Sequence, residues 1–297
     1  MKSGLIVVYK EAGFTSFDVV AKLRGILKAK KIGHTGTLDP GATGVLPIVL
    51  GKATKALNFM EDHDKTYVAG VFLGKTTDTY DWEGKVLSSS DKMISEEEFL
   101  SCMKTFLGKQ KQIPPMYSAK KVNGKKLYEL AREGIEIERK PEDIEIYDLK
   151  LLSFDFPNAV IVVSCSKGTY IRSLIHDMGE KLTCGAYMSS LERTKACGFC
   201  KDESYSLNDL QSIMDEGRID EVIRPLDELF SYSKCFCNKD ANVFVENGNV
   251  IPYKYVTFED ETLEKTLIYR VYHSDGRFAG LYKPTKEGLK LDKFFLE

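Results

Sequence analysis

Residues 31–48 read KIGHTGTLDPGATGVLPI. Four glycines and two prolines fall within it. A regular helix or strand does not tolerate that density, so the stretch predicts an ordered loop. Its only groups suited to chemistry near neutral pH are His34 and Asp39. The apolar run from Val45 to Leu50 follows the loop and can anchor it to a core.

The carboxylate of Asp39 has two interpretations when the residues alone are considered. Pro40 follows it and pushes Asp39 away from the helical region toward an extended conformation. A lone carboxylate on a loop held at both ends suits a site that needs one fixed oxyanion. The commoner role of such an Asp is to cap a turn through its side chain. Composition leaves both interpretations open.

Length and composition predict an ordinary globular protein. The 297 residues favour about two domains, and the hydrophobic and charged fractions of 43% and 29% are typical of soluble chains. No apolar run approaches the roughly 18 residues that a membrane span needs. The apolar region of the N-terminal MKSGLIVVYKEAG is too short for a signal peptide. We therefore expect a cytoplasmic protein without membrane association.

The cysteines do not predict a disulfide framework, because seven is an odd number. Cys197-Gly-Phe-Cys200 and Cys235-Phe-Cys237 can be read as a zinc site. Both pairs lie in apolar, strand-like segments, where free cysteine behaves as a small hydrophobic residue. We therefore expect no metal.

Charge is distributed unevenly although the formal net charge is only −2. Residues 1–60 hold nine basic and three acidic residues, and residues 104–126 hold seven Lys and no acid. Residues 201–230 hold three basic and nine acidic residues. This pattern indicates a basic face for phosphates and an acidic face turned away from it. The alternative is that each Lys-rich run is solvated surface.

Hydrophobic periodicity predicts a mixture of helices and strands, with residues 108–126 forming part of an insertion loop that spans about 108–140. The helix expected over 170–182 is amphipathic. Arg172 lies in its first turn, where a cation opposes the helix dipole. An anionic neighbour should offset this cost, and Asp39 is the candidate. Strands are expected over 5–9, 67–74, 144–154, 160–166 and 187–196, and further helices from 15, over 95–106, 125–133 and 207–214.

The last part of the chain predicts a separate small unit. From Val243 onward, short strand-like runs alternate with turns at Asn247-Gly248, Asp275-Gly276 and Pro284. We place the boundary near residues 228–240. The expected domains are residues 1–230, with the insertion, and residues 235–297.

Five stretches carry a family resemblance. GHTGTLDPGATGVLPI resembles the signature of the TruB family of bacterial tRNA pseudouridine synthases. Four other stretches resemble further motifs in the family's order, and together the five cover most of residues 4–200. Glu11 departs from the family, which usually has Pro there. The four stretches are YKEAGFTSFDVV (9–20), KTYVAGVFLGKTTDTYDWEG (65–84), IPPMYSAKKVNGKKLYELAREG (113–134) and KGTYIRSLIHDMG (167–179).

The resemblance implies the α+β pseudouridine synthase fold. That fold has a central, mostly antiparallel mixed sheet flanked by helices. A small C-terminal β-rich domain of the PUA-like type follows it. The C-terminal stretch of this chain carries no specific motif of its own.

The resemblance also implies roles for individual residues. Asp39 would be the catalytic carboxylate, Arg172 its ion-pair partner, and Tyr67 the active-site ring that stacks on uracil and reaches the departing proton. His34 would fill the gap that the extruded uridine leaves in the RNA. Without the motifs, Arg172, Tyr67 and His34 would be read as ordinary surface, strand and structural residues. Further substrate-binding candidates are Gly36, Asp78 and Tyr170, and the candidates for phosphate contacts are Lys10, Lys52, Lys55, Lys120 and Lys121.

The implied reaction converts uridine 55 in the T arm of tRNA to pseudouridine on a flipped-out base. It adds no atoms and is redox-neutral, so no cofactor is expected, and the phosphate-loop pattern GxxxxGK[ST] is absent. One alternative is a tRNA-binding or tRNA-folding module with little or no catalysis. Another is a guide-dependent synthase of the dyskerin type, but long basic extensions are missing. We therefore expect a monomer that needs no guide RNA or protein partner.

Overall fold

A mixed sheet forms the frame of the computed structural model, which describes residues 3–59, 63–122, 124–259 and 268–296. Among these residues the sheet has nine strands, seven of them in the order β1-β3-β12-β4-β11-β10-β7. The pairs along this order are antiparallel, except that β3 and β12 are parallel. The remaining two strands, β2 and β13, pair with β3 and β12. Strands of the main sheet are β1 (Gly4–Lys10), β2 (Ile32–His34), β3 (Thr43–Leu50), β4 (Lys65–Leu73), β7 (Gly108–Gln112), β10 (Glu142–Asp155), β11 (Asn158–Cys165), β12 (Ala186–Ala196) and β13 (Phe199–Cys200).

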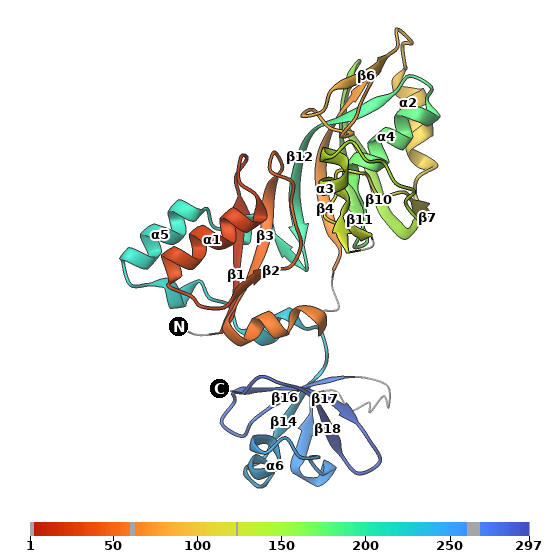
Figure 1. Cartoon of the computed structure of the whole chain (residues 1–297). Coiled ribbons are helices and arrows are strands. Elements are labelled where there is room, and N and C mark those ends of the chain that lie inside the picture. The colour runs from red at the N-terminus through yellow and green to blue at the C-terminus, as the bar shows by residue number, and fades with distance from the viewer. Residues whose placement is uncertain (1–2, 60–62, 123, 260–267, 297) are drawn as a thin grey trace.

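Helices cover the two halves of this sheet separately (Figure 1). The half that contains β1 and β3 packs against α1 and α5, and the half that contains β4, β11 and β10 packs against α2 and α4. Two short hairpins, β5–β6 and β8–β9, project from the second half. Bounds are α1 (Ser16–Leu27), α2 (Glu96–Lys104), α3 (Leu127–Arg132), α4 (Ile171–Lys181), α5 (Leu207–Asp215), β5 (Lys75–Thr77), β6 (Val86–Ser89), β8 (Lys121–Val122) and β9 (Lys125–Lys126).

Short-range sequence signals explain where three of the helices begin. Thr15, Ser95 and Ser206 each accept a hydrogen bond from the backbone amide three residues later, and an acidic side chain at that position bonds back to the cap. This reciprocal arrangement satisfies amide groups that have no partner within the helix. The helices therefore begin at 16, 96 and 207 because of local chemistry.

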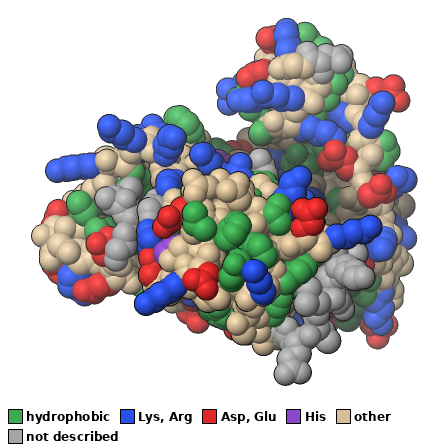
Figure 2. Space-filling model, turned by 90° about the horizontal axis from the view of Figure 1, so that it is seen from below, with side chains coloured by type: hydrophobic (Ala, Val, Ile, Leu, Met, Phe, Trp, Pro, Cys, Tyr) green, Lys and Arg blue, Asp and Glu red, His purple; other side chains and the backbone are tan. Residues whose placement is uncertain are grey.

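A second, five-stranded sheet follows in the order β15-β14-β16-β17-β18. Leu281 and Phe295 of this part lie in one cluster with Leu5, Val45 and Phe230, so the two sheets share apolar contacts. Acidic and basic side chains are interspersed on the face that Figure 2 shows. Bounds are β14 (Lys234–Cys237), β15 (Val256–Phe258), β16 (Tyr269–Tyr272), β17 (Phe278–Pro284), β18 (Leu289–Phe294) and α6 (Asn242–Glu246). Single-turn 3₁₀ segments are Gly51–Lys55, Leu57–Phe59, Lys201–Glu203, Ile219–Glu221, Leu226–Leu229, Lys239–Ala241 and Tyr253–Tyr255.

The predicted α+β architecture is confirmed, with a mixed central sheet, flanking helices and a C-terminal β unit. One local prediction was wrong. Residues 108–112 form the edge strand β7, paired with β10, and are not a loop. Residue 123 of the predicted insertion lies outside the described residues. No described helix is both long and apolar enough to cross a membrane.

The predicted separation of basic and acidic faces was also wrong. The basic segment contains α1 and the acidic segment contains α5, and these helices pack together through Val19, Leu23, Leu207 and Leu210. Several acids of the second segment are already paired, for example Glu203 with Arg224 at 2.6 Å. The acidic segment therefore lies beside the basic helix α1 and not on a face turned away from it.

Gly44 at the start of β3 offers a stability test. Its φ is +113°, and a Cβ there would lie 2.2 Å from the backbone oxygen of Arg193. We expect Gly44→Ala to lower the free energy of unfolding by more than the roughly 1–3 kcal/mol of backbone strain alone. Gly25→Ala in α1, where a Cβ meets nothing within 4 Å, should instead raise it by about 0.5–1 kcal/mol. Denaturant unfolding measures both variants. Equal changes in the free energy of unfolding would contradict the close approach of Gly44 to the Arg193 backbone.

Candidate active site

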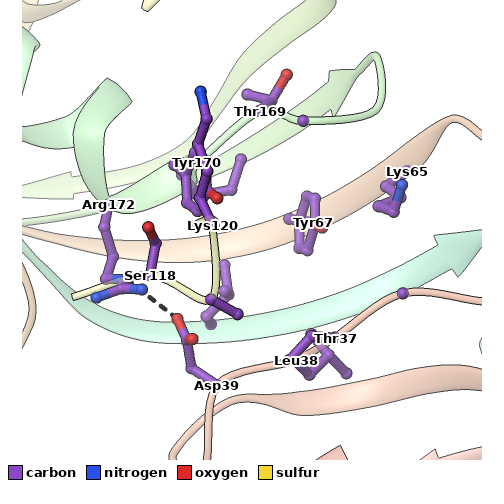
Figure 3. Close-up of a pocket in the computed structure, with 15 residues that line it drawn as sticks. Thr37, Leu38, Asp39, Lys65, Tyr67, Ser118, Lys120, Thr169, Tyr170 and Arg172 are labelled. Atoms are coloured by element: carbon purple, nitrogen blue, oxygen red, sulfur yellow. Dashed lines mark ion pairs between the residues drawn. The ribbon is translucent and has the colours of Figure 1, made fainter. Parts of the chain in front are cut away.

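A pocket of about 320 Å³ opens where the 36–39 loop, β4, the 118–120 segment and the start of α4 meet (Figure 3). It collects residues that lie up to 155 positions apart in the sequence, from Gly36 to Leu191. Its lining residues are Gly36, Thr37, Leu38, Asp39, Lys65, Tyr67, Ser118, Ala119, Lys120, Gly168, Thr169, Tyr170, Ile171, Arg172 and Leu191.

The loop that carries Asp39 is held through its backbone. Leu38 is buried in the core, and Ser16 Oγ both accepts from its amide at 2.8 Å and donates to its carbonyl at 3.2 Å. The carbonyl of Pro40, two residues further along the loop, accepts hydrogen bonds from the Gly13 amide and from Lys10 Nζ, each at 3.0 Å. The Asp39 side chain is therefore displayed from a fixed backbone and remains 40% exposed toward the pocket.

Arg172 points at Asp39, as the helix-dipole argument predicts (Figure 3). Its Nε lies 3.0 Å from Asp39 Oδ2, and its side chain is only 7% exposed. Nη1 lies 3.4 Å from Asp81 Oδ2 and 3.3 Å from the Thr79 carbonyl, and Nη2 donates to the Tyr117 carbonyl at 2.8 Å. Every nitrogen of the guanidinium thus has an acceptor, which fixes its plane and its direction.

Burial sets the protonation of the two principal groups. Desolvation raises the pKa of Asp39 above its ordinary value, although Arg172 opposes this change. Burial also raises the pKa of Tyr67 to about 12. The Tyr67 phenol therefore stays neutral at physiological pH, and a neutral phenol is a weak base. Its position in the lining favours contact through the ring over proton abstraction.

Two buried cations that sequence reasoning did not assign to this role support the loop. Arg193 is fully buried, and it donates to the carbonyls of Val45 at 2.7 Å, Gly36 at 3.1 Å and Thr37 at 3.4 Å. Lys10 is also fully buried, and its ammonium contacts three carbonyls, including that of Pro40. Desolvation lowers the pKa of Lys10 to about 8. The predicted phosphate contact by Lys10 was therefore wrong, because no part of it reaches the surface.

The predicted site residues divide between the pocket and its surroundings. Gly36, Tyr67, Lys120 and Tyr170 line the pocket with the ion pair. Tyr170 is fixed by Gln112, which bonds both its amide and its carbonyl. The Lys120 ammonium lies 2.5 Å from Glu142.

Other predicted residues lie outside the lining. His34 is partly buried in β2, where burial lowers its pKa. The Lys52 ammonium donates to the Leu296 carbonyl at 2.7 Å, while Lys55 and Lys121 are exposed. Asp78 accepts from the Lys85 amide and lines a different cavity, so it lies outside the lining of the active-site pocket, and its role in substrate binding stays a prediction.

Asp81 and Arg193 were missed by sequence reasoning. Asp81 stands three residues after Asp78 in the same motif, and nothing in the sequence distinguishes the two carboxylates. Arg193 carries a signal that could have been used. In a strand, alternate residues share a face, so Arg193 follows the buried Leu191 into the core. A charged residue on a buried face needs partners and often marks a functional region.

Two family models match this chain. The model of the TruB family pseudouridylate synthase N-terminal domain matches residues 24–171. The model of the tRNA pseudouridylate synthase B C-terminal domain matches residues 172–231. The chain belongs to the TruB family of pseudouridylate synthases. This confirms the resemblance that the motifs predict.

Relatives and solved structures agree with this assignment. The chain is 44% identical to a protein of Clostridium perfringens named tRNA pseudouridine synthase B, over 99% of each chain. It is 42% identical to a Bacillus pumilus protein of the same name, over 97% of this chain and 96% of that one. Its fold is similar to a chain of a Cbf5-Nop10-Gar1 complex, with a TM-score of 0.75 at 25% identity, covering 99% of this chain and 84% of that one.

Arg193 provides a test of the loop support in this TruB-family chain. We expect Arg193→Lys to lower the free energy of unfolding by at least roughly 1–3 kcal/mol, the cost of one buried carbonyl left without a donor. A lysine cannot reproduce the planar fork that serves three carbonyls. Denaturant unfolding provides the measurement, and Lys195→Arg, at an exposed position of the same strand beyond a β-bulge, is the control. Equal stability of the two variants would show that the carbonyl contacts do not hold the loop.

Proposed function

We propose that this chain converts uridine 55 in the T arm of tRNA to pseudouridine. The observation that carries the proposal is the ion pair between Asp39 and Arg172, formed at the edge of a pocket that Tyr67 also lines. The names of the curated relatives support tRNA as the substrate. A protein that only binds or folds tRNA has no need for a buried arginine that fixes a carboxylate at the edge of a pocket.

The reaction breaks the bond between uracil N1 and ribose C1′ and joins C5 to C1′ in its place. One proton leaves C5 and one is gained at N1, so the atoms balance without a cofactor. Asp39, when ionised, serves as a nucleophile or stabilises positive charge that develops on the sugar or the ring. Arg172 fixes the direction of that carboxylate, and the neutral Tyr67 ring packs on the base.

The target nucleotide has to leave its stack before it can reach Asp39. Lys120 at the pocket, with the exposed Lys55 and Lys121, supplies phosphate contacts, and His34 occupies the gap in the RNA. Bases of single-stranded loops can be splayed out in this manner, which suits the T arm.

The division of the chain into domains supports the same function. We propose a catalytic domain at residues 1–230 and a PUA-like RNA-binding domain at residues 235–297. The second sheet begins with β14 at Lys234, three residues after the family match ends. We also propose that the enzyme acts in the cytoplasm as a monomer, without a guide RNA or a protein partner.

The catalytic role of Asp39 can be tested directly. Asp39→Asn should lower turnover of a T-arm stem-loop by at least about a thousandfold, because an amide cannot act as a nucleophile or carry the negative charge. RNA binding should remain close to that of the wild type. Base-resolved pseudouridine mapping measures the product, and Asp91→Asn, which changes an exposed carboxylate, is the control. Retained turnover in Asp39→Asn would refute the proposed role.

The pH dependence provides a second test. Desolvation raises the pKa of Asp39 above 3.8, and the reaction needs its ionised form, so the acid limb of kcat/KM should lie above pH 3.8. The raised pKa of Asp39 also affects folding stability, and whereas catalysis favours high pH, this effect favours low pH. It is present below the unfolded pKa and is lost as pH rises through the folded pKa. Rates on the stem-loop between pH 3 and 8, with the fold monitored by circular dichroism, measure the limb. A limb at or below pH 3.8 would contradict the assignment.

A further inference from the structure

A turn between β5 and β6 touches Arg172 with two acceptors that are separated by one residue. The Thr79 carbonyl and the Asp81 carboxylate both face Nη1, at 3.3 Å and 3.4 Å. Asp81 is itself held within the turn, because its Oδ1 accepts from Thr79 Oγ1 at 2.5 Å and from the Glu83 amide at 3.1 Å. The turn therefore determines one side of the guanidinium environment.

The residue between these two acceptors has a strained backbone. Tyr80 has a φ of +63°, in the left-handed region that a non-glycine residue seldom occupies. Such a conformation persists only where surrounding contacts hold it. The Tyr80 carbonyl accepts from the Met188 amide at 3.0 Å, which ties this point of the turn to β12.

The Tyr80 side chain makes a second attachment, to α4. Its ring stacks on the ring of His176, with centroids 3.8 Å apart and planes inclined by 8°. His176 lies four residues after Arg172, so the two side chains lie on one face of the helix. The turn is thus joined to α4 at two points one helical turn apart, through the Arg172 contacts and through the ring stack.

The surroundings of His176 favour stacking as its main role. Its Nδ1 is buried and has no hydrogen-bond partner within the described ranges. Burial lowers its pKa, and Glu180 opposes this change only in part, so the ring is neutral at physiological pH. With Nδ1 unpartnered, the stack on Tyr80 is a specific contact that orients this neutral ring.

We propose that the Tyr80–His176 stack positions Arg172 by locking the 77–85 turn onto α4, so that the guanidinium stays aimed at Asp39. Both are positioning residues, since neither touches the pocket in which Asp39 lies. Thr79 and Asp81 present their oxygens to Arg172 because the ring between them is fixed. This inference rests on the proposed pseudouridine synthase activity, and it adds residues that act through Arg172.

Single-turnover kinetics on a T-arm stem-loop at saturating enzyme provide the test. His176→Ala and Tyr80→Ala should each slow the chemical step by about two- to tenfold, which corresponds to the free energy of one stacked pair. The RNA dissociation constant should not change. His176→Phe and Tyr80→Phe keep a stacked pair and should retain the wild-type rate. Phe154→Ala, which removes an aromatic contact with Phe99 elsewhere in the same core, is the matched control and should change the rate by less than about twofold.

A further variant separates positioning from general stability. Tyr80→Gly removes the ring but suits the left-handed backbone, so it should unfold less readily than Tyr80→Ala and yet react as slowly. The double variant Tyr80→Ala/His176→Ala should be no slower than either single variant. The proposal is overturned if Tyr80→Gly recovers the rate together with its stability. Multiplicative single effects, or a His176→Phe variant as slow as His176→Ala, would also overturn it.

Failure of the proposed function would be recognised separately. A wild-type protein that forms no pseudouridine refutes the activity. In that event, thermal unfolding of the two single alanine variants and the double variant still tests the stack. Non-additive losses support the lock between the turn and α4, and additive losses overturn it.

Discussion

The contact between Asp39 and Arg172 is the interaction on which the arrangement of the site depends. An arginine that is 7% exposed needs acceptors for all of its nitrogens, since an unpaired buried charge is strongly destabilising. Here the acceptors come from the Asp39 loop, the 79–81 turn and the Tyr117 carbonyl. One guanidinium therefore brings three segments to the N-terminal turn of α4. The geometry of the pocket follows from satisfying that single cation.

The loop itself is organised by a second set of cations. Arg193 and Lys10 approach it from β12 and β1, and they contact backbone oxygens. These two residues and Ser16 hold the loop through its carbonyls. The side chain of Asp39 is therefore available to the pocket and to Arg172. The density of glycine in this stretch permits the close approach, most clearly at Gly44, where the Arg193 backbone leaves no room for a Cβ.

Much of the fold could be predicted from the sequence, because its signals are local. The amphipathic period of residues 170–182 and the capping pairs at Ser95 and Ser206 specify helices without reference to the rest of the chain. The pairing of Arg172 with Asp39 was also predictable, since a cation at a helix N-terminus calls for an anion. Edge strand β7 was not, because its sequence GKQKQ lacks apolar alternation. Edge strands carry lysines that discourage further pairing, and these hide the pattern.

The residues that were missed share a physical reason. Arg193 and Lys10 act on main-chain carbonyls, which every residue possesses, so the sequence does not show which carbonyls they contact, even where the strand pattern places Arg193 on a buried face. Asp81 differs from Asp78 only by its place in a turn whose course depends on β12 and α4. The charge pattern misled for a related reason. Segments with opposite local excess of charge lie side by side, because α1 and α5 pack together.

The parallel pairing of β3 and β12 has a consequence for how the molecule is made. β12 lies between β3 and β4 in the sheet, although it is translated more than a hundred residues after either of them. The two halves of the sheet therefore cannot close on each other while the ribosome is still producing the segment before residue 186. Contacts between such distant segments are slow to form. Until β12 inserts, a nascent chain exposes the edges of β3 and β4 to unwanted pairing. During that time the loop that carries Asp39 also lacks the support of Arg193.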